Sequence, residues 1–261
     1  MSEKRTIPPP GDLRLFLSRP HDCGYLPGRQ AATLFVDPEF PMTPGLYDIM
    51  LEQGFRRSGP HVYRPYCQDC DQCIPARIAA ADFHLNRSLR RVWNANQDLR
   101  IILQPGLPAT HQGAYFDLYR RYLSARHKGG PMDNPTFSSF DDFFASRWSN
   151  THFYEFHLGR TLVMVAVVDM QPRSLSAFYT FFAPELPQRS LGTMGILWQI
   201  AQAVKLGKPW VYLGYWIPQC DKMSYKQRFR PLQIFRDKRW VILPPGSTTP
   251  PEGLSQATSR K

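Results

Sequence analysis

The sequence has no long apolar run and no leader-like start. Its longest apolar stretches, such as TLVMVAVV (161–168), are much shorter than the roughly 20 residues that span a bilayer. The opening MSEKRTIPPP has no apolar core of the kind found in secretory signals. There are five cysteines, and this odd count argues against a disulfide framework. We therefore expect a cytoplasmic protein with reduced thiols and no membrane partner.

The chain carries an excess of positive charge. It has 32 lysines and arginines against 21 acidic residues, a net charge of +11. This balance favours a polyanionic partner such as tRNA or DNA, although a generally basic surface gives the same number. Arginines 87, 90, 91 and 100 gather around Trp93 in NRSLRRVWNANQDLR. Such a segment suits phosphate binding and base stacking, or it is an amphipathic segment with Trp93 in the core.

The 261 residues fit one large domain or two modest ones, and we expect an α+β protein of two domains. The turn-rich QPGLPAT (104–110) predicts a boundary between an N-terminal, cysteine-bearing α/β domain (1–105) and a second domain (106–245), followed by a flexible tail (246–261). In the second domain, the pattern of apolar residues predicts two helices, three antiparallel strands, a helix and a further strand. This order resembles the acetyltransferase-like (GNAT) fold. In its QRSLGTMG, however, Met194 occupies a place that coenzyme A binding reserves for a small residue.

Three cysteines are evenly spaced in YRPYCQDCDQCIPAR, namely Cys67, Cys70 and Cys73. Cys23 lies in the same predicted domain and supplies a fourth thiol. Four thiolates suit zinc or an iron–sulfur cluster, and the alternative is a set of reduced structural thiols. In either case, we do not expect catalysis to require a metal at these cysteines.

Two stretches together carry a family resemblance. CGYLPGRQA, GFRRSGPHVYRP and the cysteine triplet form one, and LGYWIPQCDKMSYKQRFRP forms the other. They resemble the arginyl-tRNA–protein transferase family, in particular its bacterial branch. The resemblance implies transfer of leucine from leucyl-tRNA to proteins that begin with Asp or Glu, which marks them for degradation by the N-end rule pathway. The choice of leucine over arginine rests on the branch alone, and the oligomeric state stays open.

The acceptor side of this reaction needs cations. An N-terminal Asp or Glu carboxylate calls for a cationic pocket, ideally with arginine. GFRRSG offers Arg56, Arg57 and Ser58 for this purpose. Because the aminoacyl ester is already activated, alignment and oxyanion stabilisation supply most of the catalysis, and no covalent nucleophile is required. Asp169 is the predicted proton acceptor, and Glu155, inside a strand, is a second candidate.

The donor side is predicted in CDKMSYKQRFR and in the strand before it. Lys222, Lys226 and Arg228 are candidates for holding tRNA phosphates, with a solvated basic helix face as the alternative. Tyr225 is a candidate donor to the ester carbonyl or to the terminal adenosine. Tyr212 lies on the strand that would hold the donor chain.

Two other classes of function compete with the transferase. One is a coenzyme A-dependent N-acetyltransferase, which Met194 disfavours. The other is a non-enzymatic zinc-containing protein that binds nucleic acid. The three differ in whether leucyl-tRNA, acetyl-coenzyme A or neither is consumed.

Overall fold

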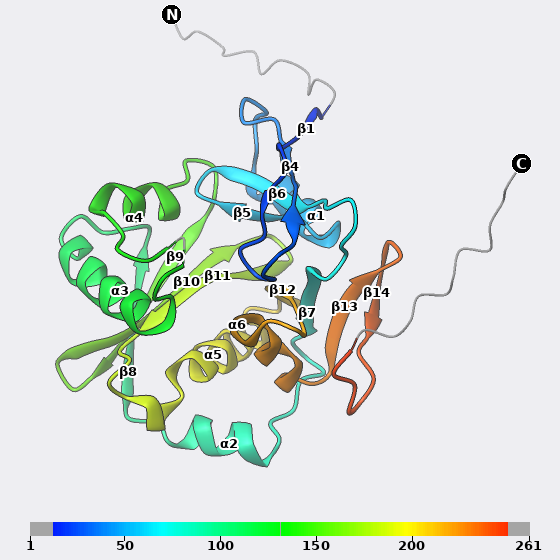
Figure 1. The fold of residues 1–261 in the computed structure, drawn as a ribbon. Coiled ribbons are helices and arrows are strands. Elements are labelled where there is room, and N and C mark those ends of the chain that lie inside the picture. Colours follow the sequence, from blue (N-terminus) through cyan, green and yellow to red (C-terminus); the bar gives the residue numbers. More distant parts are fainter. Residues whose placement is uncertain (1–12, 131, 250–261) are drawn as a thin grey trace, which may run out of the picture.

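A computed structural model describes residues 13–130 and 132–249 (Figure 1). Most of the predicted tail, residues 250–261, lies outside the described residues. None of the described helices is long and apolar enough to cross a membrane. The strands are β1 Leu15–Leu17, β2 His21–Asp22, β3 Gln30–Ala31, β4 Thr33–Val36, β5 Arg56–Ser58, β6 His61–Pro65, β7 Ile74–Ala79, β8 Leu99–Pro105, β9 Thr151–Leu158, β10 Thr161–Met170, β11 Ser174–Phe182, β12 Trp210–Trp216, β13 Leu232–Arg236 and β14 Arg239–Ile242. The helices are α1 Pro44–Glu52, α2 Arg87–Asn94, α3 Gln112–Arg126, α4 Phe137–Phe144, α5 Leu191–Lys205 and α6 Asp221–Ser224, with 3-10 turns η1 Pro187–Arg189 and η2 Tyr225–Arg228. The chain is therefore a mixed α/β protein.

One eight-stranded sheet forms the centre, in the order β14-β13-β7-β12-β11-β10-β9-β8. Phe181 of β11 packs edge-on against Tyr115 of α3, so α3 lies on one face. The next residue back, Thr180, faces Gly195 of α5 on the other face. Because both faces are covered, β10 is buried almost throughout, which explains its continuous apolar run.

A smaller sheet, β1-β4-β6-β5, lies beside the large one and packs with α1 around its own core (Figure 1). Helix α1 begins at an N-cap, Thr43, whose hydroxyl accepts a hydrogen bond from the Leu46 amide at 3.2 Å. After it, Gly54 adopts φ +82°, a left-handed conformation that glycine adopts readily. The chain then turns directly into β5.

The large sheet continues across the position predicted as a domain boundary. Strand β7 pairs with β12 and β13, and β8 pairs with β9, although both strands precede residue 106. The turn-rich segment 104–110 therefore leads from β8 of the large sheet to α3, which lies on one face of the same sheet. Sequence reasoning placed β7 with the first domain because strand pairing between distant segments leaves no local mark.

A buried ion pair joins the two sheets. Arg57 of β5 donates from Nε and Nη2 to the Asp169 carboxylate of β10, at 2.8 and 2.6 Å. Both side chains are 0% exposed. The remaining donors of Arg57 reach the Gly59 carbonyl and the Thr151 hydroxyl, at 2.9 and 3.0 Å. The Nε, Nη1 and Nη2 atoms of Arg57 thus all donate hydrogen bonds to groups of the protein itself.

This ion pair predicts a large loss of stability when one partner is removed. Arg57→Met should lower the free energy of unfolding by about 3–5 kcal/mol, because Asp169 is left as an uncompensated buried charge. The matched control is Arg121→Met, which breaks the exposed 2.7 Å pair with Glu185 and should cost about 0–1 kcal/mol. Urea unfolding measures both, and equal losses in the two variants would contradict a structural role for the buried pair.

Candidate functional site

The site centres on Arg56, at the point where two strands of the large sheet stop pairing. Strands β11 and β12 are parallel partners only along Ser174–Ser176 and Trp210–Tyr212. Just beyond, Arg56 donates to the Ala177 carbonyl at 2.8 Å and to the Tyr212 carbonyl at 3.5 Å. Its guanidinium therefore bridges carbonyls of both strands where the ladder ends, and the side chain is buried.

Gly214 keeps the backbone close to this guanidinium. It has φ +83° in β12, and a Cβ placed there would lie 3.7 Å from the Nε atom of Arg56. The pairing of β12 with β7 is also irregular between Tyr212 and Gly214. A glycine is therefore favoured here by its conformation, and the strand bends around the Arg56 side chain.

Lys226 of η2 is a second buried cation. It is 2% exposed, and its Nζ lies 3.6 Å from the Met223 sulfur and 4.6 Å from the centre of the Tyr225 ring. Burial, together with the nearby Arg56 charge, lowers the pKa of Lys226 to about 7, although Cys220 acts in the opposite direction. Within residues 13–130 and 132–249, no ion pair involves Arg56 or Lys226. Two neighbouring buried cations without a carboxylate form a site suited to an anion.

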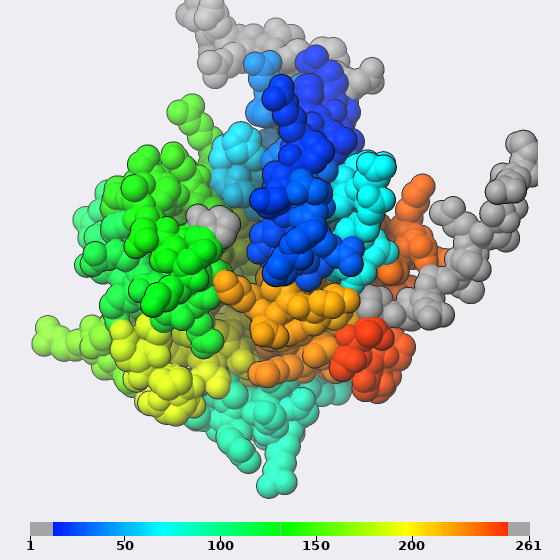
Figure 2. Space-filling model, viewed as in Figure 1, coloured from blue at the N-terminus to red at the C-terminus, as the bar shows by residue number. Residues whose placement is uncertain are grey.

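Figure 2 shows a hollow between helices α3 and α4, the N-terminal strands and the segment around α6. Three tyrosines, Tyr122, Tyr179 and Tyr225, lie near one another, and Tyr225 lies near Arg56. Tyr122 and Tyr179 pack edge-to-face at 6.3 Å, and the buried Tyr179 hydroxyl has no hydrogen-bond partner among the described residues. Tyr225 is 37% exposed. Burial lowers the pKa of His127, at the end of α3, and the Lys222 charge lowers it further, so α6 lies near that end of α3.

The structure brings together only some of the residues predicted from sequence. Arg56, Tyr225 and Lys226 lie together, and Lys222 and Arg228 are exposed nearby. The sequence analysis did not identify Tyr122 and Tyr179 as candidate site residues. They lie in RRYLSARH and SAFYTFF, where a tyrosine could equally be a core residue.

Other predicted residues have different roles. Arg57 and Asp169 are fully buried against each other, so neither has a free group for a substrate carboxylate or for accepting a proton. The Tyr212 hydroxyl accepts from Arg77 at 3.3 Å, and its ring packs on Trp240, so only its carbonyl reaches Arg56. Ser58 is half-buried at the end of β5.

Glu155 also has a structural environment. His111 and the Tyr115 hydroxyl each contact one carboxylate oxygen at 2.7 Å, and His157 contacts the other at 2.9 Å. Burial acts to raise the pKa of Glu155, but these hydrogen bonds outweigh it and the pKa is lowered. The carboxylate is thus held ionised inside the sheet, which makes it a poor proton acceptor.

Comparison with known proteins places the chain in a family. A model described as "Arginine-tRNA-protein transferase, N terminus" matches residues 21–91, and one described as "Arginine-tRNA-protein transferase, C terminus" matches residues 114–236. The chain is 48% identical over 231 residues to the "Aspartate/glutamate leucyltransferase" of Pseudomonas fluorescens (strain Pf0-1), covering 88% of this chain and 97% of the relative. The protein of that name from Pseudomonas aeruginosa (strain LESB58) matches with the same identity and coverage.

The chain belongs to the arginine-tRNA-protein transferase family.

The resemblance seen in the sequence is therefore confirmed. The two family models match separate ranges that end at residue 91 and begin at residue 114, whereas the sheet is continuous across this interval. In this family chain, the two buried cations Arg56 and Lys226 are the main feature to explain.

The four predicted metal ligands line one pocket but do not form a ligand set. Cys23, Cys67, Cys70 and Cys73 border a cavity of about 240 Å³. The Cys23 sulfur accepts from the Leu26 amide at 3.4 Å, and the Cys67 sulfur donates to the Ala32 carbonyl at 3.7 Å. Burial raises the pKa of Cys73 to about 12, and the other cysteines reinforce this. Among the described residues, no three His, Cys, Asp or Glu side chains are placed to hold a metal, so the predicted zinc or iron–sulfur site is not supported.

The QRSLGTMG loop, where an acetyltransferase would bind coenzyme A, is closely packed by the protein itself. A Cβ at Gly192 would lie 2.9 Å from the Phe182 ring, and Met194 is buried. Arg189, just before α5, is paired with Asp98 through two bonds of 2.8 Å. These contacts occupy the groups that would receive a pyrophosphate and argue against the acetyltransferase alternative.

The cysteine geometry predicts that the fold does not depend on a bound metal. Protein purified without oxygen should contain well under one zinc or iron per chain, because no three potential ligand side chains of the described residues are placed to hold a metal. Treatment with 1,10-phenanthroline should leave the melting temperature unchanged. Elemental analysis showing one metal ion per chain, lost together with folding on chelation, would contradict this.

Proposed function

We propose that this chain transfers leucine from leucyl-tRNA to the N-terminal amine of proteins that begin with Asp or Glu. The product would carry a new N-terminal leucine and enter N-end rule degradation. The relatives named aspartate/glutamate leucyltransferase support the assignment, since nearly their whole length matches. The observation within the site that carries it is the pair of buried cations, Arg56 and Lys226, without a carboxylate partner.

On this proposal, Arg56 and Lys226 bind the acidic side chain of the acceptor. A carboxylate entering the hollow would supply the missing counter-charge for both cations, and its desolvation would be offset by two charge-assisted contacts. An amide of the same size would leave both charges uncompensated. From the sequence, Arg56 and Arg57 were the predicted carboxylate-binding residues. Lys226 takes the place of Arg57 in this proposal, because Arg57 is already neutralised by Asp169.

The donor would enter from the rim of the hollow. We assign Lys222 and Arg228 to phosphates of the tRNA 3′ end, and Tyr225 to the terminal adenosine or the ester carbonyl. The unpartnered Tyr179 hydroxyl is a further donor at the floor. The acceptor amine attacks the ester carbon, the bond to the ribose oxygen breaks, and that oxygen takes up the proton released by the amine. Alignment accounts for this step without a protein nucleophile.

The finer description of the fold belongs to the same proposal. We propose that residues 106–245 follow the acetyltransferase-like plan, supported by the parallel β11–β12 pair that stops after three residues. The cysteine-bearing segment, residues 1–105, would supply Arg56 and the acceptor side of the hollow. Because the donor is an aminoacyl-tRNA, we propose that the reaction takes place in the cytoplasm.

The proposal predicts selectivity that depends on Lys226. Wild-type protein should transfer labelled leucine from leucyl-tRNA to peptides starting with Asp or Glu, and RNase should abolish the transfer. Lys226→Met should lower kcat/KM for the Asp peptide about 10- to 150-fold, the equivalent of one charged hydrogen bond of about 1.5–3 kcal/mol. Transfer to an otherwise identical Asn peptide should stay near its low starting value.

The control is Lys205→Met, which removes an exposed lysine at the end of α5. It should leave both peptides unaffected. Absence of transfer from leucyl-tRNA by the wild type, or equal loss with Asp and Asn peptides in Lys226→Met, would contradict the assignment.

The lowered pKa of Lys226 predicts a pH dependence. Below about pH 7 the ammonium is charged and ready for the carboxylate; above it the free enzyme must take up a proton on binding. The ratio of kcat/KM for Asp and Asn peptides should therefore fall as pH rises from 7 to 9, by up to about tenfold per pH unit. Taking the ratio cancels titration of the acceptor amine. In Lys226→Arg the ratio should not change with pH. A ratio that fell with pH in this variant as it does in the wild type would refute the role of Lys226.

A further inference from the structure

We propose that the outer face of α2 binds the phosphate backbone of RNA and guides the tRNA toward the hollow. The proposal rests on the proposed function, which supplies tRNA as the substrate. Arg90 and Arg91 follow Arg87 by three and four residues on α2, and together with Asn94 the three arginines line an open groove of about 620 Å³. We call these three arginines the arginine ridge.

The charge of the arginine ridge is uncompensated. All three side chains are exposed, and none takes part in an ion pair within the described part of the chain. Other arginines close to it are engaged. Arg189 is paired with Asp98, and Arg230 donates to the Leu243, Pro244 and Ser247 carbonyls at 2.6–2.8 Å. Arg90 donates one bond of 3.4 Å to the Leu85 carbonyl, but no carboxylate of the described residues pairs with the ridge, so its three adjacent guanidinium groups match a row of phosphates.

The helix that carries the ridge is firmly anchored. Asn86 caps it by accepting from the Leu89 amide at 2.9 Å, and Leu89 is buried in the main core. The Asn96 side chain donates to both the Val92 and Arg189 carbonyls, at 2.8 and 2.9 Å. Trp93 also packs against the core, so it anchors the helix and is not placed for base stacking. The arginines therefore stand on a rigid support, which reduces the entropy lost on binding.

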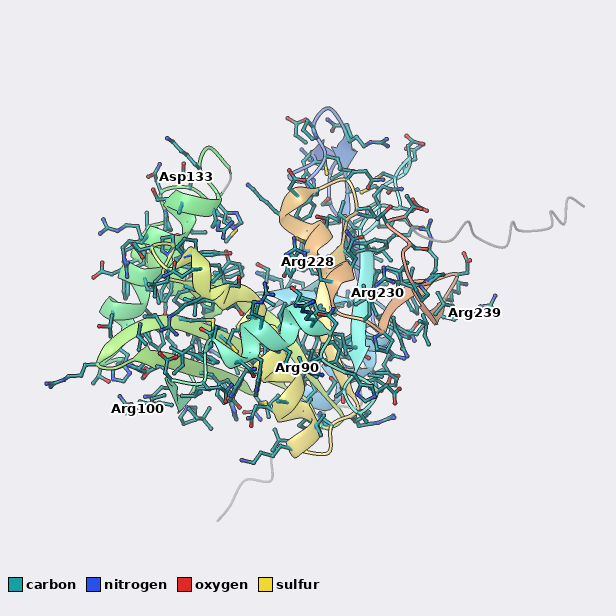
Figure 3. All side chains as sticks on the ribbon, turned by 90° about the horizontal axis from the view of Figure 1, so that it is seen from below. Arg90, Arg100, Asp133, Arg228, Arg230 and Arg239 are labelled. Carbon is teal, nitrogen blue, oxygen red and sulfur yellow. The ribbon has the colours of Figure 1, made fainter. Side chains whose placement is uncertain are left out.

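The ridge is continuous with the donor side of the hollow. Phe83, before α2, packs on Phe229, directly after η2, with ring centres 6.5 Å apart. Figure 3 shows Arg90 and Arg228 on the same face of the molecule, whereas Arg100 on β8 lies apart from them. Positively charged side chains therefore extend from Lys222 and Arg228, near the hollow, to the arginine ridge. An RNA stem whose 3′ end enters the hollow would place its backbone along this line.

Fluorescence anisotropy with labelled, uncharged tRNA tests the ridge separately from catalysis. The triple variant Arg87→Ala, Arg90→Ala, Arg91→Ala should raise Kd about tenfold or more and reduce the slope of log Kd against log salt by about 2–3, close to one per lost phosphate contact. Transfer assays on the same variant should show a raised KM for leucyl-tRNA and an unchanged KM for the Asp peptide. The triple variant Arg100→Ala, Arg120→Ala, Arg239→Ala is the matched control for net charge and should leave the Kd nearer to wild type.

The outcomes separate this inference from the proposed function. If both triple variants lower affinity and slope equally, the tRNA responds to net charge and the ridge is overturned, whatever the transfer activity. If the ridge variant alone loses affinity, the inference stands even where leucine transfer is absent. Melting temperatures of the two variants should match that of the wild type, since the replaced side chains are exposed and alanine favours the helix.

Discussion

The position of the whole site depends on the buried ion pair between Arg57 and Asp169. It joins strand β5 of the small sheet to strand β10 of the large one, and Ser149 and Thr151 complete the coordination of the carboxylate. A bidentate pair with no exposed surface tolerates little displacement, since any shift would leave a buried charge unsatisfied. Because Arg56 is the adjacent residue, fixing Arg57 also fixes where Arg56 enters the large sheet.

Two consecutive arginines therefore have opposite functions. Successive side chains of a strand point to opposite sides, so Arg56 and Arg57 meet different neighbours. Arg57 meets a carboxylate and becomes part of the framework, while Arg56 meets carbonyl oxygens, which take its hydrogen bonds but leave its charge uncompensated. The nearby Lys226, with a pKa lowered to about 7, adds a second charge at the same place. The energy of burying these cations favours an anionic ligand, and it provides a physical basis for discriminating an acidic side chain from a neutral one.

The two substrates can thus be handled by two different arrangements of positive charge. Arg56 and Lys226 are buried, so on the proposed function they would interact strongly with a single small carboxylate and respond weakly to salt. On η2 and α2 the arginines are exposed, so each contributes little alone and several must act together on a polyanion. The same net charge of +11 is consistent with both arrangements, which is why composition alone did not separate them.

The family could be predicted from motifs spread over most of the chain, and so could the main helices and strands of the second half, whose periodic apolar patterns are local. Arg56, Lys226 and Tyr225 were among the predicted candidates because their residue types suit the chemistry. The fold was needed to show that Asp169 neutralises Arg57, that β7 and β8 join the large sheet, and that the Cys23 and Cys67 sulfurs bond to backbone groups. Each of these outcomes depends on contacts between residues far apart in the chain. Periodicity and spacing report on neighbours within a few residues, whereas the compensation of a buried charge is set by whichever distant side chain the fold brings to it.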